Sequence, residues 1–130
     1  MSVAVRYFSR SGNTKAVADA IAQAAGVSAV SVDAPDAAVK EETDVLFVGG
    51  ALYAYGIDKN LKKYLVSLDA GKTKKAVVFS TSALSKHSVD LIKKGLSQKG
   101  IPVESDFFYA KSKPGKAQLD QAAQFAKKYI

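Results

Sequence analysis

Residues 3–23 read VAVRYFSRSGNTKAVADAIAQ, and this stretch decides the fold that we predict. Its first part is apolar at successive positions, as in a parallel strand covered on both faces, and predicts a strand over Val3–Phe8. Val17 and Ile21 then recur at helical spacing, so a helix follows. A short polar segment, residues 9–14, separates the two elements. This order of strand, polar segment and helix is typical of an alternating α/β chain.

The polar segment has the chemistry of an anion site. A helix that begins near Asn13 offers backbone N–H groups without intrahelical partners and the positive end of its dipole. Gly12 allows the backbone to approach an anion closely or to adopt a positive φ. One Ser or Asn would suffice to cap the helix, yet four of the six side chains carry a hydroxyl or an amide. The candidate residues are Ser9, Arg10, Ser11, Gly12, Asn13 and Thr14.

The rest of the chain continues the alternation of strands and helices. Further apolar runs predict strands over Ala29–Val32, Val45–Gly49 and Ala76–Phe79, with a weaker one from Ile101 to about Tyr109. Residues 33–43 predict either a short helix or a loop. The remaining segments between strands, and the end of the chain, have apolar residues at helical spacing. The helical faces are Leu61, Leu65 and Leu68; Val89, Ile92 and Leu96; and Leu119, Ala122, Ala126 and Ile130.

This alternation predicts one α/β domain over residues 1–130. Five strands in a chain of this length fit a doubly wound parallel sheet with the strand order 2-1-3-4-5 and right-handed crossovers. Ligands of such sheets bind beyond the carboxyl ends of the strands, at the switch point between strands 1 and 3. The loops after Phe8, Gly50 and Phe79 are therefore the ones expected to form a site.

Composition excludes several function classes. The 130 residues are 48% hydrophobic and 24% charged, as in an ordinary soluble domain. The absence of cysteine excludes disulfides, thiolate metal sites and the cysteine-dependent tyrosine phosphatases of this fold. Gly49 and Gly50 stand where a response-regulator receiver needs a phosphorylatable Asp. No apolar run approaches the roughly 20 residues that span a bilayer. Without a secretory signal either, we expect a cytoplasmic protein that does not insert into membranes.

The net charge of +7 is unevenly distributed. Residues 1–70 carry seven basic and eight acidic side chains, whereas residues 71–130 carry twelve and four. Arginine occurs only at Arg6 and Arg10, and no basic stripe is interleaved with aromatic residues, so we do not expect nucleic-acid binding. The lysines either solvate the ends of helices and strands or favour a partner with an acidic docking surface.

Residues 8–15, FSRSGNTK, resemble the phosphate loop of the flavodoxin family, Ser/Thr-x-Ser/Thr-Gly-x-Thr. The resemblance implies the flavodoxin-like form of the doubly wound fold and places residues 9–14 around the 5′-phosphate of FMN. Two roles stay open for Arg10. Its guanidinium either pairs with the phosphate directly or points outward while backbone groups hold the phosphate.

The resemblance also assigns two later loops, GGALYAYGIDKN (49–60) and STSALSKHS (80–88), to the flavin ring. An aromatic residue of the first loop stacks on the ring in the family; Tyr55, beside Gly56, matches it best, and Tyr53 is the competitor. The second loop hydrogen-bonds the pyrimidine end through backbone groups, and this chain lacks a second aromatic residue there. The resemblance implies these ring-binding residues: Ala51, Leu52, Tyr53, Ala54, Tyr55, Gly56, Ser80, Thr81, Ser82, Ala83 and Leu84.

The resemblance implies an electron-transfer protein in which FMN supplies the chemistry and redox partner proteins exchange the electrons. The uneven charge favours partners with acidic docking surfaces. Residues 50–56, GALYAYG, also resemble a loop of the menaquinone-dependent protoporphyrinogen oxidases, so a small quinone-linked FMN oxidoreductase is the alternative. We assign no catalytic residue and no metal site. His87, the only histidine, is expected in the first turn of a helix rather than as a proton donor.

Overall fold

The computed structural model describes residues 2–53, 56–82 and 85–130. Within these residues, five parallel strands form one sheet in the order β2-β1-β3-β4-β5. The predicted fold class and strand order are therefore confirmed. The strands are β1 (Val3–Tyr7), β2 (Ala29–Ser31), β3 (Val45–Ala51), β4 (Ala76–Ser82) and β5 (Val103–Lys111).

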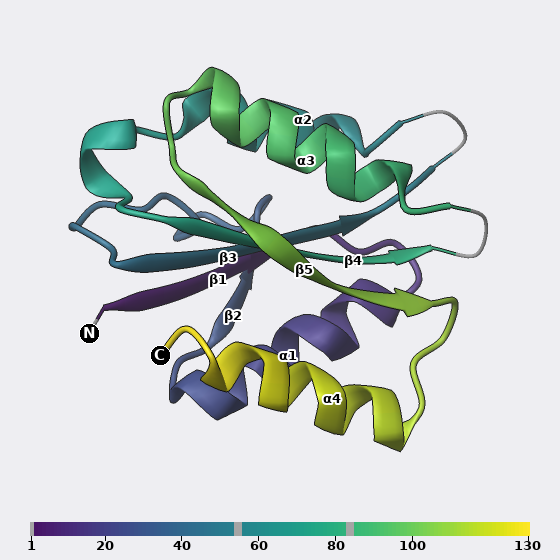
Figure 1. Cartoon of the computed structure of the whole chain (residues 1–130). Helices are drawn as coiled ribbons and strands as arrows, with labels where there is room; N and C mark the ends of the chain where they lie inside the picture. The colour runs from purple at the N-terminus through teal and green to yellow at the C-terminus, as the bar shows by residue number, and fades with distance from the viewer. Residues whose placement is uncertain (1, 54–55, 83–84) are drawn as a thin grey trace.

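Helices cover both faces of the sheet. Helices α1 and α4 lie on one face, and helices α2 and α3 lie together on the other (Figure 1). None of the helices in the described residues is long and apolar enough to cross a membrane. The helices are α1 (Asn13–Ala25), α2 (Lys59–Ser67), α3 (His87–Gln98) and α4 (Lys116–Lys127), with a short 3-10 helix, η1, at Ala70–Lys72.

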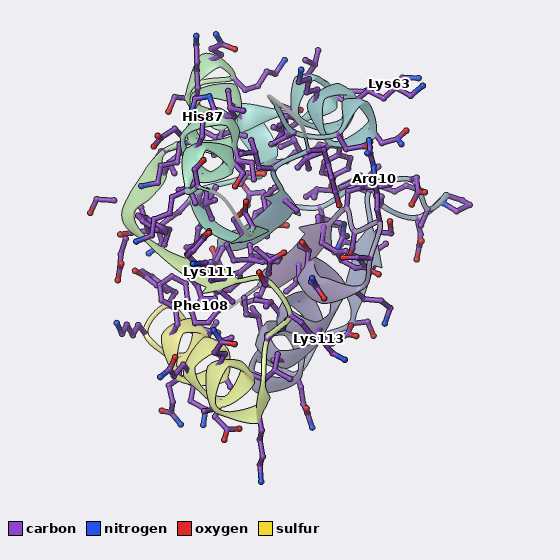
Figure 2. All side chains as sticks on the ribbon, turned by 90° about the vertical axis from the view of Figure 1, so that its right-hand side faces the viewer. Arg10, Lys63, His87, Phe108, Lys111 and Lys113 are labelled. Carbon is purple, nitrogen blue, oxygen red and sulfur yellow. The ribbon has the colours of Figure 1, made fainter. Side chains whose placement is uncertain are left out.

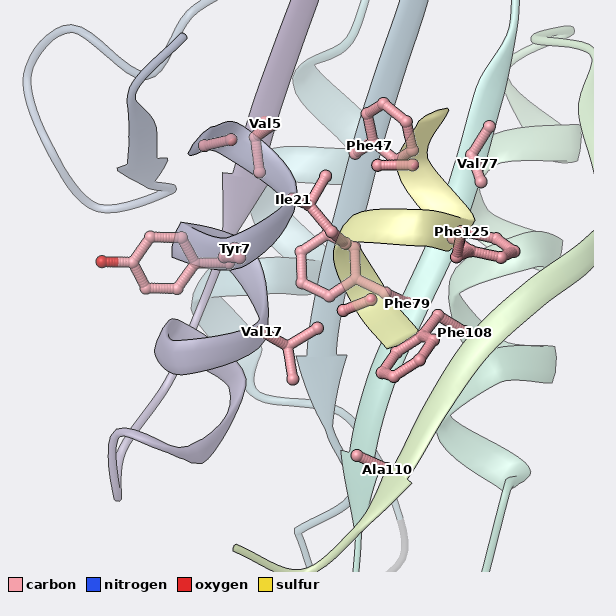
Figure 3. Packing of buried hydrophobic residues seen from close by; sticks show 14 of the residues in the cluster. Val5, Tyr7, Val17, Ile21, Phe47, Val77, Phe79, Phe108, Ala110 and Phe125 are labelled. Atoms are coloured by element: carbon pink, nitrogen blue, oxygen red, sulfur yellow. The ribbon is translucent and has the colours of Figure 1, made fainter. Parts of the chain in front are cut away.

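Each face of the sheet has its own buried apolar cluster. Under α1 and α4, Ile21 packs near Phe79, Phe108 and Phe125 (Figure 3). The rings of Phe108 and Phe125 lie 5.9 Å apart at a tilt of 51°, a favourable aromatic geometry. The cluster under α2 and α3 includes Leu61 and other aliphatic residues of both helices. The predicted helical faces supply both clusters, because residues three and four apart share a side of a helix.

Three strands extend further than the sequence predicts, and one of them, β5, runs over Val103–Lys111 instead of from Ile101 to about Tyr109. Strand β3 continues past Gly49 to Ala51, and β4 continues past Phe79 to Ser82. Placing the third loop's start at Ser80 was therefore wrong, because strand pairing with β3 or β5 continues through Ser80, Thr81 and Ser82. A polar side chain fits in a buried strand when its hydroxyl has a partner, and the Ser80 hydroxyl donates to the Gly50 carbonyl at 2.5 Å.

Other boundaries differ by a few residues. Strand β1 ends at Tyr7 rather than Phe8, and α4 ends at Lys127 rather than Ile130. Residues 33–43 contain turns and no helix, so the loop alternative is the observed one. This loop is anchored at the buried Ala37, whose carbonyl oxygen accepts hydrogen bonds from Arg6 and Tyr64.

The two glycines of β3 make room for large side chains, one from the neighbouring strand β4 and one from helix α2. A Cβ added to Gly49 would lie 2.1 Å from a ring carbon of Phe79, and one added to Gly50 would lie 2.4 Å from Leu61 Cδ2. Phe79 and Leu61 belong to the clusters on opposite faces, as the alternation of side chains along a strand requires. Each glycine therefore makes room for a buried side chain on one face.

We expect Gly49→Ala to destabilise the fold, because the added methyl group overlaps the fully buried Phe79 ring. Overpacking of this kind costs about 1–3 kcal/mol of unfolding free energy, which urea denaturation measures. The control is Gly71→Ala, whose methyl group meets only the Asp69 side chain and should change stability by less than about 0.5 kcal/mol. Equal stability of the two variants would contradict this packing account.

Candidate functional site

The carboxyl ends of the strands meet at one edge of the sheet, and the three loops singled out from the sequence begin there. Figure 2 looks onto this edge and labels Arg10, His87, Lys111 and Lys113 around it. The loop after β1 runs directly into α1, and those after β3 and β4 lead towards α2 and α3. Parallel strands place these loops side by side although they are far apart in the sequence.

The loop after β1 forms a helix start that lacks a side-chain cap. Gly12 is the N-cap residue of α1, with φ +93° in the left-handed region, and no side chain caps the helix there. The Ser9 hydroxyl accepts a hydrogen bond from Gly12 N–H at 3.0 Å. The Ser11 hydroxyl lies 3.5 Å from Asn13 N, at the limit of a hydrogen bond. The polar side chains of this loop therefore shape its backbone without capping the helix.

A buried hydrogen bond joins the first loop to the end of β4. The hydroxyl oxygens of Thr14 and Thr81 lie 2.7 Å apart, and the two residues are 1% and 2% exposed. One hydroxyl donates to the other, so the pair retains a second hydroxyl hydrogen for a further acceptor. Sequence patterns placed both residues in the site, and the structure brings them into contact.

The predicted third loop divides into a strand part and a loop part. The buried Ser80 hydroxyl also lies 2.6 Å from that of Ser88, so it links β3, β4 and the start of α3. Ser82 is buried at the end of β4, and its carbonyl oxygen accepts a hydrogen bond from the Tyr109 hydroxyl. Ala83 and Leu84 lie outside the described residues.

Tyr53 and Gly56, which follow β3, pair with each other, and Tyr53 contacts the first loop. Tyr53 and Gly56 exchange two backbone hydrogen bonds, of 2.7 and 3.0 Å. The Tyr53 hydroxyl accepts a hydrogen bond from the backbone N–H of Arg10 at 3.0 Å. Ala54 and Tyr55 lie outside the described residues, whereas Ala51 ends β3 and Leu52 is half-buried.

Arg10 ties the first two loops together through its side chain. Its guanidinium donates to the Asp58 carboxylate at 2.6 and 3.0 Å and lies over the Tyr53 ring at 4.0 Å. Asp58 is 5% exposed and also caps α2 by accepting a hydrogen bond from Asn60 N–H at 2.8 Å. We name these contacts the Arg10–Tyr53–Asp58 link. In this structure the Arg10 charge therefore faces a carboxylate of the protein.

Asp58 is the residue of this site that sequence reasoning missed. Its position directly before a helical pattern is typical of an N-cap, which was the available signal. The partnership with Arg10 spans 48 residues and leaves no local pattern. Burial by itself would raise the pKa of the Asp58 carboxyl, but the hydrogen bonds from Asn60 and Arg10 and the Arg10 charge outweigh burial and lower the pKa.

His87 is the first residue of α3, where the sequence places it. It is exposed, and its backbone N–H donates to the Ser85 hydroxyl at 3.2 Å. No group of three or more metal-binding side chains gathers in the described residues.

Two substitutions of Asp58 separate its two roles. Asp58→Asn retains the cap of α2 but removes the charge; because Arg10 is 57% exposed, we expect a loss of about 0.2–1 kcal/mol of unfolding free energy. Asp58→Ala also removes the cap and should cost about 1 kcal/mol more. Urea denaturation measures both, and Asp19→Asn, which breaks an exposed pair with Lys15, is the control.

The charge of Asp58 also predicts a pH dependence. Because its pKa is lower in the folded state, its stabilising effect is complete above the unfolded-state value of about 3.9 and is lost as the pH falls through the folded-state value. The stability difference between wild type and Asp58→Asn should therefore shrink below about pH 3.9. A difference that stays constant or grows in acid would contradict this assignment.

The whole chain can be compared with known proteins. No curated protein matches the sequence significantly. Oxidised flavodoxin 1 from Bacillus cereus is 21% identical with a TM-score of 0.78, covering 99% of this chain and 97% of that chain. A flavodoxin from the domain Archaea is 22% identical with a TM-score of 0.75, covering 99% and 96%.

The same fold is also similar to part of a larger protein. Rubredoxin oxygen:oxidoreductase from Desulfovibrio gigas is 17% identical with a TM-score of 0.78, covering 98% of this chain but 34% of that chain. These structural likenesses show a shared fold. The family is shown by the sequence itself, because the flavodoxin domain model matches residues 4–128. The chain therefore belongs to the flavodoxin domain family.

Proposed function

We propose that this protein is an electron carrier that binds FMN at the carboxyl edge of its sheet and exchanges electrons with partner proteins. FMN is the cofactor of the flavodoxin family. The observation that carries the proposal is the uncapped, left-handed start of α1 at Gly12, held against the loop after β3 and the end of β4.

The first loop fits a phosphate monoester. An added Cβ at Gly12 would meet nothing within 4 Å, so space lies open above the loop backbone. The first turn of α1 adds the N–H groups of Thr14 and Lys15, which have no partner in the described residues, and the positive end of a helix dipole, which together favour an anion. The residues that would hold the phosphate are Ser9, Ser11, Gly12, Asn13 and Thr14.

Arg10 would support phosphate binding indirectly, by holding the loop after β1 in place. Its guanidinium is bound to Asp58, so its direct contribution is to fix the loop after β1 against the loop after β3. Tyr53 completes this contact through its hydroxyl and its ring. This engagement of the Tyr53 ring favours Tyr55 as the aromatic residue for the flavin ring, with Gly56 beside it.

The bound FMN would supply reversible one- or two-electron transfer, while the protein orients the cofactor and controls access. Lys86, Lys111 and Lys113 are exposed around the edge, and none forms an ion pair with the described residues. Charges beside a redox edge steer the encounter with a partner. We therefore propose that the partners of this carrier present acidic surfaces and that the exchange takes place in the cytoplasm.

Substitution of Gly12 tests the cofactor site. Gly12→Ala places a side chain on a residue at φ +93°, which costs about 1–2 kcal/mol, so we expect FMN binding to weaken by about tenfold. Quenching of flavin fluorescence measures the affinity. The matched control is Gly115→Ala, at the N-cap of α4, where φ is −88° and space is equally open. Equal affinity of both variants, or no FMN binding by wild type, would contradict the proposal.

Salt dependence tests the predicted partner charge. The reduced protein should reduce succinylated cytochrome c, whose lysines have become acidic, faster at low than at high salt, because screening weakens attraction. Native cytochrome c is basic, so its reduction should accelerate as salt is added. Stopped-flow absorbance under anaerobic conditions measures both rates. The same sign of salt dependence for the two acceptors would contradict an acidic partner.

A quinone-linked oxidoreductase is the second candidate, favoured only by the similarity of residues 50–56 to the protoporphyrinogen oxidases. Turnover of protoporphyrinogen with a menaquinone analogue, at a rate above that of free FMN, would favour this candidate over the carrier.

A further inference from the structure

A groove of about 270 Å³ runs between α2 and α3, on the face of the molecule that Figure 1 shows at the top. Its apolar lining comes from both helices and includes Leu65, Val66 and Leu91. Val66 is 70% exposed, the largest exposure of a large hydrophobic residue in the described part of the chain. A single exposed valine is ordinary, but here it stands on the rim of a concave apolar surface.

A glycine in the middle of α3 shapes the groove. Gly95 lies opposite α2, and a Cβ added to it would lie 2.9 Å from Leu65 Cδ1. Glycine inside a helix costs about 1 kcal/mol relative to alanine. Here it lets the two helices pack closely and leaves a shallow channel above their contact.

Lysines surround this apolar surface. Lys62, Lys94 and Lys99 line the groove, whereas its lining contains no acidic residue. None of the three forms an ion pair with the residues that the structure describes. Helix α2 has three lysines and no acidic residue between Lys59 and Ser67. An apolar channel with an unpaired cationic rim is complementary to an apolar side chain flanked by carboxylates.

We propose that the α2–α3 groove docks an acidic amphipathic helix of a partner protein. Apolar residues of that helix, spaced i, i+3 or i+4, would enter the groove over Val66 and Leu91, and its Asp or Glu residues would face the three lysines. Helix α3 has 12 residues and is about 18 Å long, so a partner helix of about three turns matches it. This docking needs no bound flavin and goes beyond electron transfer at the sheet edge.

The charge and the shape of the groove favour an acidic helix over a second copy of the chain or a membrane surface. A second copy of the chain would bring the same lysines against Lys62, Lys94 and Lys99, and like charges oppose such a contact. A membrane surface binds helices that present a protruding apolar face, whereas this apolar surface is concave. The groove also reaches the predicted flavin loop, since a Cβ on Gly56 would lie 3.6 Å from Lys62 Nζ. A partner held in the groove would therefore stand beside the redox edge.

The test uses a synthetic peptide of about 15 residues, about four turns when helical, with Leu at i, i+3, i+4 and i+7, Glu at a few flanking positions and Ala elsewhere, because crowded like charges destabilise a short helix. Titrating it into ¹⁵N-labelled protein should shift amide signals of α2 and α3 and give a dissociation constant. The double variant Lys94→Glu/Lys99→Glu should bind the peptide about tenfold more weakly. Lys116→Glu/Lys127→Glu, on α4 across the sheet, should change affinity less than about twofold.

Several outcomes would overturn the proposal. These are an absence of binding, equal weakening by both double variants, equal binding of a peptide with Gln in place of Leu, or shifts centred outside α2 and α3. Lysine-dependent binding to phosphatidylserine vesicles without peptide binding would assign the groove to a membrane. Dimerisation that Val66→Glu abolishes would assign it to a second copy. FMN affinity, measured for the same variants, should not change. A loss of peptide binding in the groove can therefore be distinguished from a loss of FMN binding at the sheet edge.

Discussion

The loops at the carboxyl edge of the sheet are held in place by the way α1 begins immediately after the first loop. Gly12 takes a left-handed conformation, and the helix starts without a side-chain cap, so the N–H groups of Thr14 and Lys15 have no partner among the described residues and are open to an anion. The Thr14–Thr81 hydrogen bond fixes this start to β4, and the Arg10–Tyr53–Asp58 link fixes it to the loop after β3. A phosphate held there would orient the rest of the cofactor across the ends of β3 and β4.

The sequence was sufficient for the architecture and for the sheet edge at which the three loops meet. Successive apolar residues in β1 and β3, with helical spacing at Val17 and Ile21, predict parallel strands and crossover helices, and these determine where the loops meet. The predicted boundaries erred at Ser80, because a hydroxyl in a strand looks like a loop residue until its partner is known. That partner is the Gly50 carbonyl, 30 residues away.

The charged contacts of the site were less predictable. Arg10 and Asp58 each have an ordinary local explanation, as a loop cation and as a helix cap, and only the fold brings them together. The question raised by the sequence was whether Arg10 faces the phosphate or solvent. In the structure, the Arg10 guanidinium instead pairs with the buried carboxylate of Asp58, which also caps the start of α2. Arg10 thus fixes the loop after β1 against the loop after β3.

Amide chemical shifts can show whether FMN binds where α1 begins. When FMN is titrated into ¹⁵N-labelled protein, the account predicts the largest shifts at residues 9–15, with further shifts in the loops after β3 and β4. Saturable binding that leaves residues 9–15 unshifted would contradict the account, because the phosphate would then lie elsewhere.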